Sequence, residues 1–241
     1  MNYIQIANKI YKERYSDAEF LMLAGSIIRG EGTETSDLDI VVIYEKVDKA
    51  FRESFIYEGT MVEVFAHDMS TLKYFIYNLD YNEGRPVMAT MINEGMVIPS
   101  ETKLSNELKT LAREHIKKGP KITNPEKIDS MRYNITNLLD DLKDSRNRHE
   151  QMAIAVRLYE DLAELYFRTK GYWRGKGKSI VRIMKKYNPD FALRYNESFD
   201  LLFKKEDSSK VMELGEELLN FVGGYLFEGY KLEGNKEWRI D

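Results

Sequence analysis

One apolar run near the N-terminus constrains the fold of this chain more than any other segment. Residues 38–44 are LDIVVIY, which is rich in β-branched side chains and predicts a buried strand. Further short apolar runs predict strands at residues 18–23, 61–65 and 96–98. Apolar residues at helical spacing predict helices at residues 3–15, 70–82 and 87–95. We therefore predict an α/β domain: a small mixed sheet with helices on one side.

The pattern changes in the second half of the chain. Residues 115–125 combine three Lys, a Gly and two Pro, which is typical of a linker. Asn124 or Thr123 would then cap a helix with Pro125 at its first position, and the pattern stays helical almost to the end. At 241 residues the chain exceeds the usual size of one domain. We predict an α+β organisation, with a mixed-sheet domain at residues 1–118 and an all-helical domain at residues 124–241.

Composition limits the ligands and the location. The chain has no Cys and only three His, none at paired spacing, so oxygen ligands and a hard cation such as Mg²⁺ are expected at any metal site. The charged N-terminus and the lack of a membrane-spanning run predict a soluble, cytoplasmic protein. The net charge of −4 argues against broad nucleic-acid binding and favours a small acceptor, although a local basic patch could override this.

The most informative motif combines a small turn with three acidic residues. Gly25-Ser26 is followed after ten residues by Asp37-Leu38-Asp39, and Glu63 lies between two valines on a later predicted strand. Side chains alternate along a strand, so Asp37 and Asp39 share a face. Glu63 joins them if its strand pairs beside theirs. Three carboxylates at close quarters repel each other unless a cation neutralises them. Two Mg²⁺ ions about 3.5–4 Å apart could hold an attacking hydroxyl and a leaving pyrophosphate in line.

The residues around this trio fit a phosphate group. Gly25 would let the backbone approach a phosphate closely, and Ser26 adds a hydroxyl donor. Arg29, about one helical turn later, would point at the same anion, although a surface arginine is an equal alternative. Ser36 could cap or orient the loop before Asp37, or be an ordinary loop residue.

These residues carry a family resemblance. The segment AGSIIRGEGTETSDLDIVVIY followed by VEV resembles the DNA polymerase β-type nucleotidyltransferase superfamily, most closely over residues 18–66. The helical half is similar in layout to antibiotic nucleotidyltransferases such as the aminoglycoside and lincosamide enzymes, and Arg29 and Ser36 match polar positions of their nucleotide loop.

The resemblance implies a metal-dependent transfer of a nucleoside monophosphate, expected to be AMP from ATP, to a hydroxyl of a small acceptor. Asp37 and Asp39 would bridge two Mg²⁺ ions, and Glu63 would hold the ion nearer the acceptor. Related antibiotic enzymes also suggest a homodimer.

Several alternatives stay open at this point. The acceptor could be a protein hydroxyl or an RNA end, and a second class is a non-catalytic nucleotide sensor or toxin–antitoxin partner. A general base could come from the polar face of the helix at residues 153–168, which offers Glu160, Asp161 and Glu164, or that face could simply be solvated.

The sequence Gly-Lys-Gly-Lys-Ser at residues 175–179 fails as a phosphate-binding P-loop because its first glycine is out of place, so Lys176 and Lys178 fit a solvated loop better. His67 is expected to be structural. Tyr166, Tyr172 and Trp173 could stack on a ligand but are more typical of a core.

Overall fold

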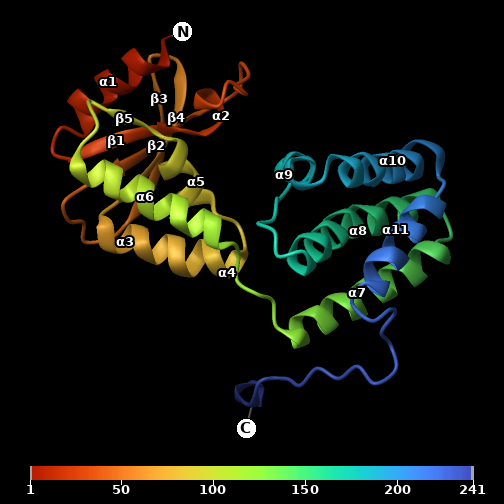
Figure 1. The fold of residues 1–241 in the computed structure, drawn as a ribbon. Coiled ribbons are helices and arrows are strands. Elements are labelled where there is room, and N and C mark those ends of the chain that lie inside the picture. The colour runs from red at the N-terminus through yellow and green to blue at the C-terminus, as the bar shows by residue number, and fades with distance from the viewer. Residues whose placement is uncertain (1, 240–241) are drawn as a thin grey trace. The chain divides into compact units, whose positions relative to one another are not determined.

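The computed structural model describes residues 2–239, and the chain divides into two compact units between Pro120 and Lys121. The first unit contains the sheet, and the second is helical (Figure 1). Each has its own hydrophobic core. The fold class predicted from the sequence, a mixed-sheet domain followed by helices, is therefore confirmed.

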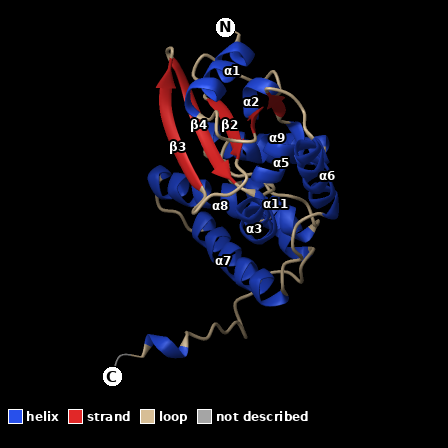
Figure 2. Cartoon of the chain, turned by 90° about the vertical axis from the view of Figure 1, so that its left-hand side faces the viewer, coloured by secondary structure: helices blue, strands red, loops and turns tan. Residues whose placement is uncertain are grey.

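The sheet has five strands in the order β3-β4-β2-β1-β5. Its strands are β1 (Phe20–Ala24), β2 (Leu38–Ile43), β3 (Phe51–Tyr57), β4 (Thr60–His67) and β5 (Met96–Ile98). Only the β2–β4 pair is parallel, so the sheet is mixed. Figure 2 shows β2, β4 and β3 side by side. In the central strand β2, every residue except Asp39 is buried. Asp39 is therefore the one partly exposed residue of an otherwise buried strand.

Helices cover both faces of the sheet, which corrects the prediction of helices on one side. α1 (Tyr3–Arg14) packs on the face that contains Ile40 and Val42. The opposite face, with Val41 and Ile43, is covered by α3 (Met69–Tyr74), α5 (Val87–Glu94) and α6 (Lys103–Lys118). Both faces of β2 are apolar, and each must therefore be removed from water.

Several connections differ from the sequence predictions. α2 (Gly25–Ile28) has only four residues, and the helix predicted at residues 70–82 is α3 followed by the π-helix η1 (Phe75–Asp80) and α4 (Tyr81–Glu83). Gly84, at φ 71°, ends this series. Strand β3 was not predicted at all. Because α6 extends to Lys118, the linker is shorter than predicted and covers residues 119–124.

Within residues 121–239, the second unit has five α-helices and a short 3₁₀ turn. They are α7 (Pro125–Lys143), α8 (Arg148–Thr169), α9 (Ser179–Tyr187), α10 (Pro189–Lys205), α11 (Ser209–Asn220) and η2 (Lys236–Trp238). Asn124 caps α7 by accepting the Lys127 amide at 3.0 Å, with Pro125 in the first turn as predicted. The regular helices end at Asn220, earlier than the sequence pattern indicated.

The segment that follows α11 is held by side chains of α7. The Arg132 guanidinium donates to the carbonyls of Gly223 and Gly224 at 2.9 and 3.1 Å. Tyr133 stacks on Tyr230 with ring centroids 4.1 Å apart. These contacts fix the path of the chain beyond the last long helix, although it has almost no regular structure there.

Candidate functional site

The parallel pairing of β2 and β4 brings three carboxylates together. Asp37 directly precedes β2, Asp39 is its second residue, and Glu63 lies opposite Asp39 in the β4 register. One carboxylate oxygen from each residue lies within 4.8 Å of the other two, and all three residues are partly buried. Such a set of oxygen donors suits a hard divalent cation. The three acidic residues selected from the sequence thus meet at one point.

The electrostatics of this acidic trio favour a cation. Burial, followed by the charges of Asp37 and Glu63, raises the pKa of Asp39 to about 6. The charge of Arg29 acts in the opposite direction but does not cancel the repulsion. A divalent cation among the three carboxylates would remove this repulsion, so the residues present fit a metal such as Mg²⁺.

Gly25 leaves the space that the trio needs. β1 ends at Ala24, which pairs with Asp39, and Gly25 turns the chain away with φ 78°. A Cβ atom at this position would lie 1.9 Å from Oδ2 of Asp39. Only glycine therefore fits both the backbone conformation and the close approach. Ser26 follows at the second position of the short helix α2.

Arg29 and Ser36 both have defined partners. The Arg29 guanidinium donates to Glu31 at 3.0 Å and to Glu94 at 2.5 Å. Any contact of Arg29 with a phosphate would compete with these carboxylates. The Ser36 hydroxyl accepts the Thr33 amide at 2.8 Å and so closes the loop that leads into the trio. This contact agrees with a role for Ser36 in orienting the loop.

The structure adds two residues that sequence reasoning missed, Arg52 and Glu94. Arg52 on β3 donates from Nε to Oε1 of Glu63 at 3.0 Å, and its Nη2 contacts the same oxygen. Its guanidinium also lies over the Phe65 ring, 5.2 Å from the centroid. No motif marks Arg52 in the sequence, because its role depends on the pairing of two strands. Glu94 on α5, which binds Arg29, was missed for a similar reason.

The carboxylates proposed from the sequence as general bases lie on α8. Glu160 is exposed, and Asp161 accepts from Arg157 at 2.9 Å. Burial raises the pKa of Asp161. Glu164 accepts from Arg168 at 2.6 Å, and Arg174 is 3.6 Å away. Although burial raises the pKa of Glu164, these arginines lower it overall, which makes Glu164 a weak base.

The other residues singled out from the sequence have mainly structural surroundings. His67 is 2% exposed, with Nδ1 3.3 Å from the Thr71 hydroxyl. Tyr166 is buried and stacks on Phe191 with centroids 4.0 Å apart. Trp173 is also buried, as expected of a core residue.

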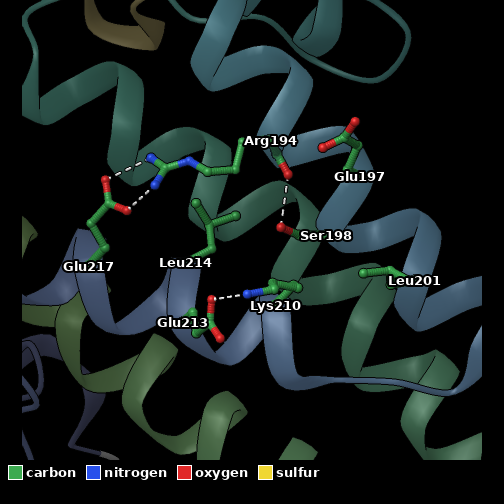
Figure 3. Close-up of a pocket in the computed structure, with 8 residues that line it drawn as sticks. All are labelled: Arg194, Glu197, Ser198, Leu201, Lys210, Glu213, Leu214 and Glu217. Atoms are coloured by element: carbon green, nitrogen blue, oxygen red, sulfur yellow. Dashed lines mark hydrogen bonds and ion pairs between the residues drawn. The ribbon is translucent and has the colours of Figure 1, made fainter.

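A separate hollow of about 310 Å³ lies between α10 and α11 in the second unit (Figure 3). Its charged side chains largely neutralise one another. Arg194 pairs with Glu217 at 2.6 Å, and Lys210 pairs with Glu213 at 2.6 Å. The hollow contains none of the acidic trio, and we assign no chemistry to it.

Comparison with known proteins bears on the first unit. Residues 4–88 match the model of a family described as a nucleotidyltransferase domain. The match runs from α1 into α5 and includes Gly25, Ser26 and the whole acidic trio. It supports a transferase that moves nucleoside monophosphates. Comparison with curated proteins found no significant match.

Among solved structures, the chain is similar to a nucleotidyltransferase-like protein from Exiguobacterium sibiricum. The two are 17% identical, the similarity covers 92% of this chain and 74% of the other, and the TM-score is 0.43. Similarity at this level says nothing about the substrates. In the part of the chain that the structure describes, each helix is too short or too polar to cross a membrane.

Proposed function

We propose that the protein transfers a nucleoside monophosphate, AMP from ATP, to a hydroxyl of a small acceptor and releases pyrophosphate. The observation that carries this proposal is the convergence of Asp37, Asp39 and Glu63 inside a matched nucleotidyltransferase domain. A protein that only binds a nucleotide has no evident need for three clustered carboxylates, which repel each other without a cation.

In this proposal the trio holds two Mg²⁺ ions. When bound, the ions supply Lewis-acid stabilisation of charge on the attacking and leaving oxygens. The acceptor hydroxyl would give up its proton to a base, and its oxygen would bond to the α-phosphorus. The bond from that phosphorus to the bridging oxygen of the β-phosphate would break, and pyrophosphate would leave. Rigid placement of the carboxylates on β2 and β4 is the contribution of the fold, because catalysis of this kind depends on positioning.

The nucleotide side of the site would comprise Gly25, Ser26, Arg29 and Ser36. Gly25 leaves room beside Asp39, and Ser26 would donate to a phosphate oxygen. Arg29 would exchange one of its two carboxylate partners for the triphosphate, a swap between anions that leaves its charge paired. Ser36 would keep the loop in place through its bond to Thr33.

We infer the class of acceptor from the charge of the chain. A chain with 40 acidic and 36 basic residues favours a cationic small molecule, such as an aminoglycoside-like compound, over an anionic one. The second candidate is a nucleotide-binding protein without transferase activity, including a toxin–antitoxin partner. Acceptor-dependent release of pyrophosphate separates the two.

The test is pyrophosphate release from each of the four common nucleoside triphosphates with Mg²⁺, across aminoglycosides, lincosamides, a protein acceptor and an RNA acceptor. We expect release with ATP and a small cationic acceptor, and a loss of several orders of magnitude in Asp39→Asn. Asp48→Asn removes a carboxylate from an exposed loop of the same unit and should leave the rate unchanged. Wild-type turnover by Asp39→Asn would exclude the proposed mechanism.

A further inference from the structure

Positive charge in the second unit is concentrated in one stretch of the chain. The 25 residues at positions 165–189 contain eight Lys and Arg and no Asp or Glu. Outside this stretch 28 basic residues face 40 acidic ones. The net charge of −4 is therefore the sum of a cationic segment and an acidic remainder of the chain.

α9 arranges much of this charge on one side. Residues at spacings of three and four lie on the same helix face. The face formed in this way, which we call the basic stripe, contains the exposed side chains of Lys178, Arg182, Lys185 and Lys186. The opposite face of α9 is apolar, and Ile180 and Met184 there are buried in the core of the second unit. The core thus fixes the orientation of the helix and points the stripe to solvent.

Most of this charge lacks an acidic partner within residues 2–239. No ion pair neutralises Lys176, which precedes α9, or the three lysines of the stripe, although Arg182 does have a partner. Two lysines elsewhere in the unit differ: Lys204 pairs with Asp200 at 2.8 Å, and Lys210 pairs with Glu213 (Figure 3). Clustered, unpaired cations create a field that attracts an extended anion.

Tyr187, the last residue of α9, lies on the apolar side of the helix, three residues after Met184. The Tyr187 ring stacks on Tyr172 with centroids 4.0 Å apart and an interplanar angle of 2°. The Trp173 amide donates to the Tyr187 hydroxyl at 3.2 Å, which fixes the ring, and 36% of Tyr187 remains exposed. The ring therefore stands apart from the stripe, which is an array of cations alone, suited to the phosphates of a nucleic acid rather than to its bases.

The length of the stripe also favours a polymer. Lys178, which caps α9, and Lys186 near its end are eight residues apart, which corresponds to ~12 Å along the helix axis. This distance spans several backbone phosphates and exceeds what one phosphate group needs. A lipid surface fits less well, because an interfacial helix inserts an exposed apolar face and the apolar face of α9 is buried in the core.

We propose that the basic stripe, together with Lys176, binds the phosphate backbone of single-stranded nucleic acid. This inference goes beyond the proposed transfer reaction and does not depend on it. The acidity of the whole chain does not oppose it, because screening confines electrostatic attraction to roughly 10 Å around the stripe at physiological salt.

The test is fluorescence anisotropy of a labelled single-stranded RNA 12-mer titrated with the full chain at several salt concentrations. We expect binding whose log affinity falls with log salt at a slope of about −2 to −3, as for three or four phosphate contacts. The Lys178→Gln/Lys185→Gln/Lys186→Gln variant should bind at least tenfold more weakly and with a shallower slope.

The matched control is Lys204→Gln/Lys205→Gln/Lys210→Gln, which removes the same charge from the same unit and should bind like the wild type. Circular dichroism would check that each variant is folded. No binding by the wild type, or an equal loss in both triple variants, would overturn the proposal. The proposal would also be overturned if the stripe bound phosphatidylserine vesicles and did not bind RNA. None of these outcomes bears on pyrophosphate release, which is measured separately.

Discussion

Gly25 shows how a missing side chain shapes the acidic trio. Two constraints act at this position: the backbone has φ 78°, and a Cβ atom would lie 1.9 Å from the Asp39 carboxylate. Another glycine in this unit is subject only to the first constraint. Gly30 has φ 71° with nothing within 4 Å of its Cβ position. Alanine at Gly30 therefore tests backbone strain alone, whereas alanine at Gly25 tests strain and displacement of the carboxylate together.

We predict that Gly30→Ala lowers the free energy of unfolding by about 1–2 kcal/mol and leaves Mn²⁺ affinity unchanged. Gly25→Ala should lose more stability and, because Asp39 must move, bind Mn²⁺ on the order of 10- to 100-fold more weakly. Urea unfolding and Mn²⁺ calorimetry would measure the two effects. Equal Mn²⁺ affinity in both variants would show that Gly25 does not position Asp39.

Arg52 competes with a cation for Glu63. Its guanidinium binds the Glu63 carboxylate, so a metal ion at the trio must displace or repel this positive charge. We predict that Arg52→Gln binds Mn²⁺ about fivefold more tightly, since ~1 kcal/mol of repulsion is typical for a largely exposed group. Lys9→Gln, which removes the exposed ion pair with Glu58, is the control. Weaker binding by Arg52→Gln would instead mean that Arg52 supports the site.

Sequence reasoning could locate only part of this site. Asp37, Asp39 and Glu63 could be identified because strand alternation and one assumed strand pairing bring them together. Arg52 and Glu94 could not, because their contacts depend on the register of β3 and on the packing of α5. The phosphate role of Arg29 likewise remains a prediction.

At the scale of elements, the burial of each strand determined whether it could be predicted from the sequence. The strands β1 and β2 are almost wholly buried and have clear apolar patterns. β3 is an edge strand whose residues are mostly exposed, so no apolar alternation marked it. The two-sided covering of the sheet was missed for another reason: an apolar run shows that a strand is buried but does not show which helices bury it.

The buried His67 at the end of β4 makes the first unit sensitive to acid. Burial lowers its pKa to about 4, against 6.5 in an unfolded chain. The unfolded state therefore binds a proton first as the pH falls. The stability that neutral His67 provides is complete above pH 6.5 and is lost towards pH 4, by roughly 2–3 kcal/mol.

We predict that His67→Gln removes this part of the pH dependence. Urea unfolding at pH 7.5 and 4.5 should show a smaller loss of stability in the variant than in the wild type. The carboxyls of Asp39 and Asp80, whose pKa values are raised to about 6, act with the opposite sign. Both carboxyls are present in the wild type and in the variant. The difference between the two pH profiles is therefore the contribution of His67. Identical pH profiles would contradict the assignment.

At the scale of the whole molecule, the chain separates two kinds of charge. The first unit gathers carboxylates at the junction of β2 and β4, and the second gathers cations on α9. Net charge alone cannot reveal this separation, because it averages over both units. The proposed nucleotidyl transfer rests on the acidic trio, and the proposed binding of nucleic acid rests on the basic stripe.

The central claim is that Asp37, Asp39 and Glu63 together bind the divalent cations used in nucleotidyl transfer. Its most direct test is Mn²⁺ binding to the wild type, Asp39→Asn and Asp48→Asn, measured by calorimetry with and without a nonhydrolysable ATP analogue. We predict that the wild type and Asp48→Asn bind Mn²⁺ more tightly with the analogue, and that Asp39→Asn binds at least ~10–100-fold more weakly. Wild-type Mn²⁺ affinity in Asp39→Asn would contradict the claim.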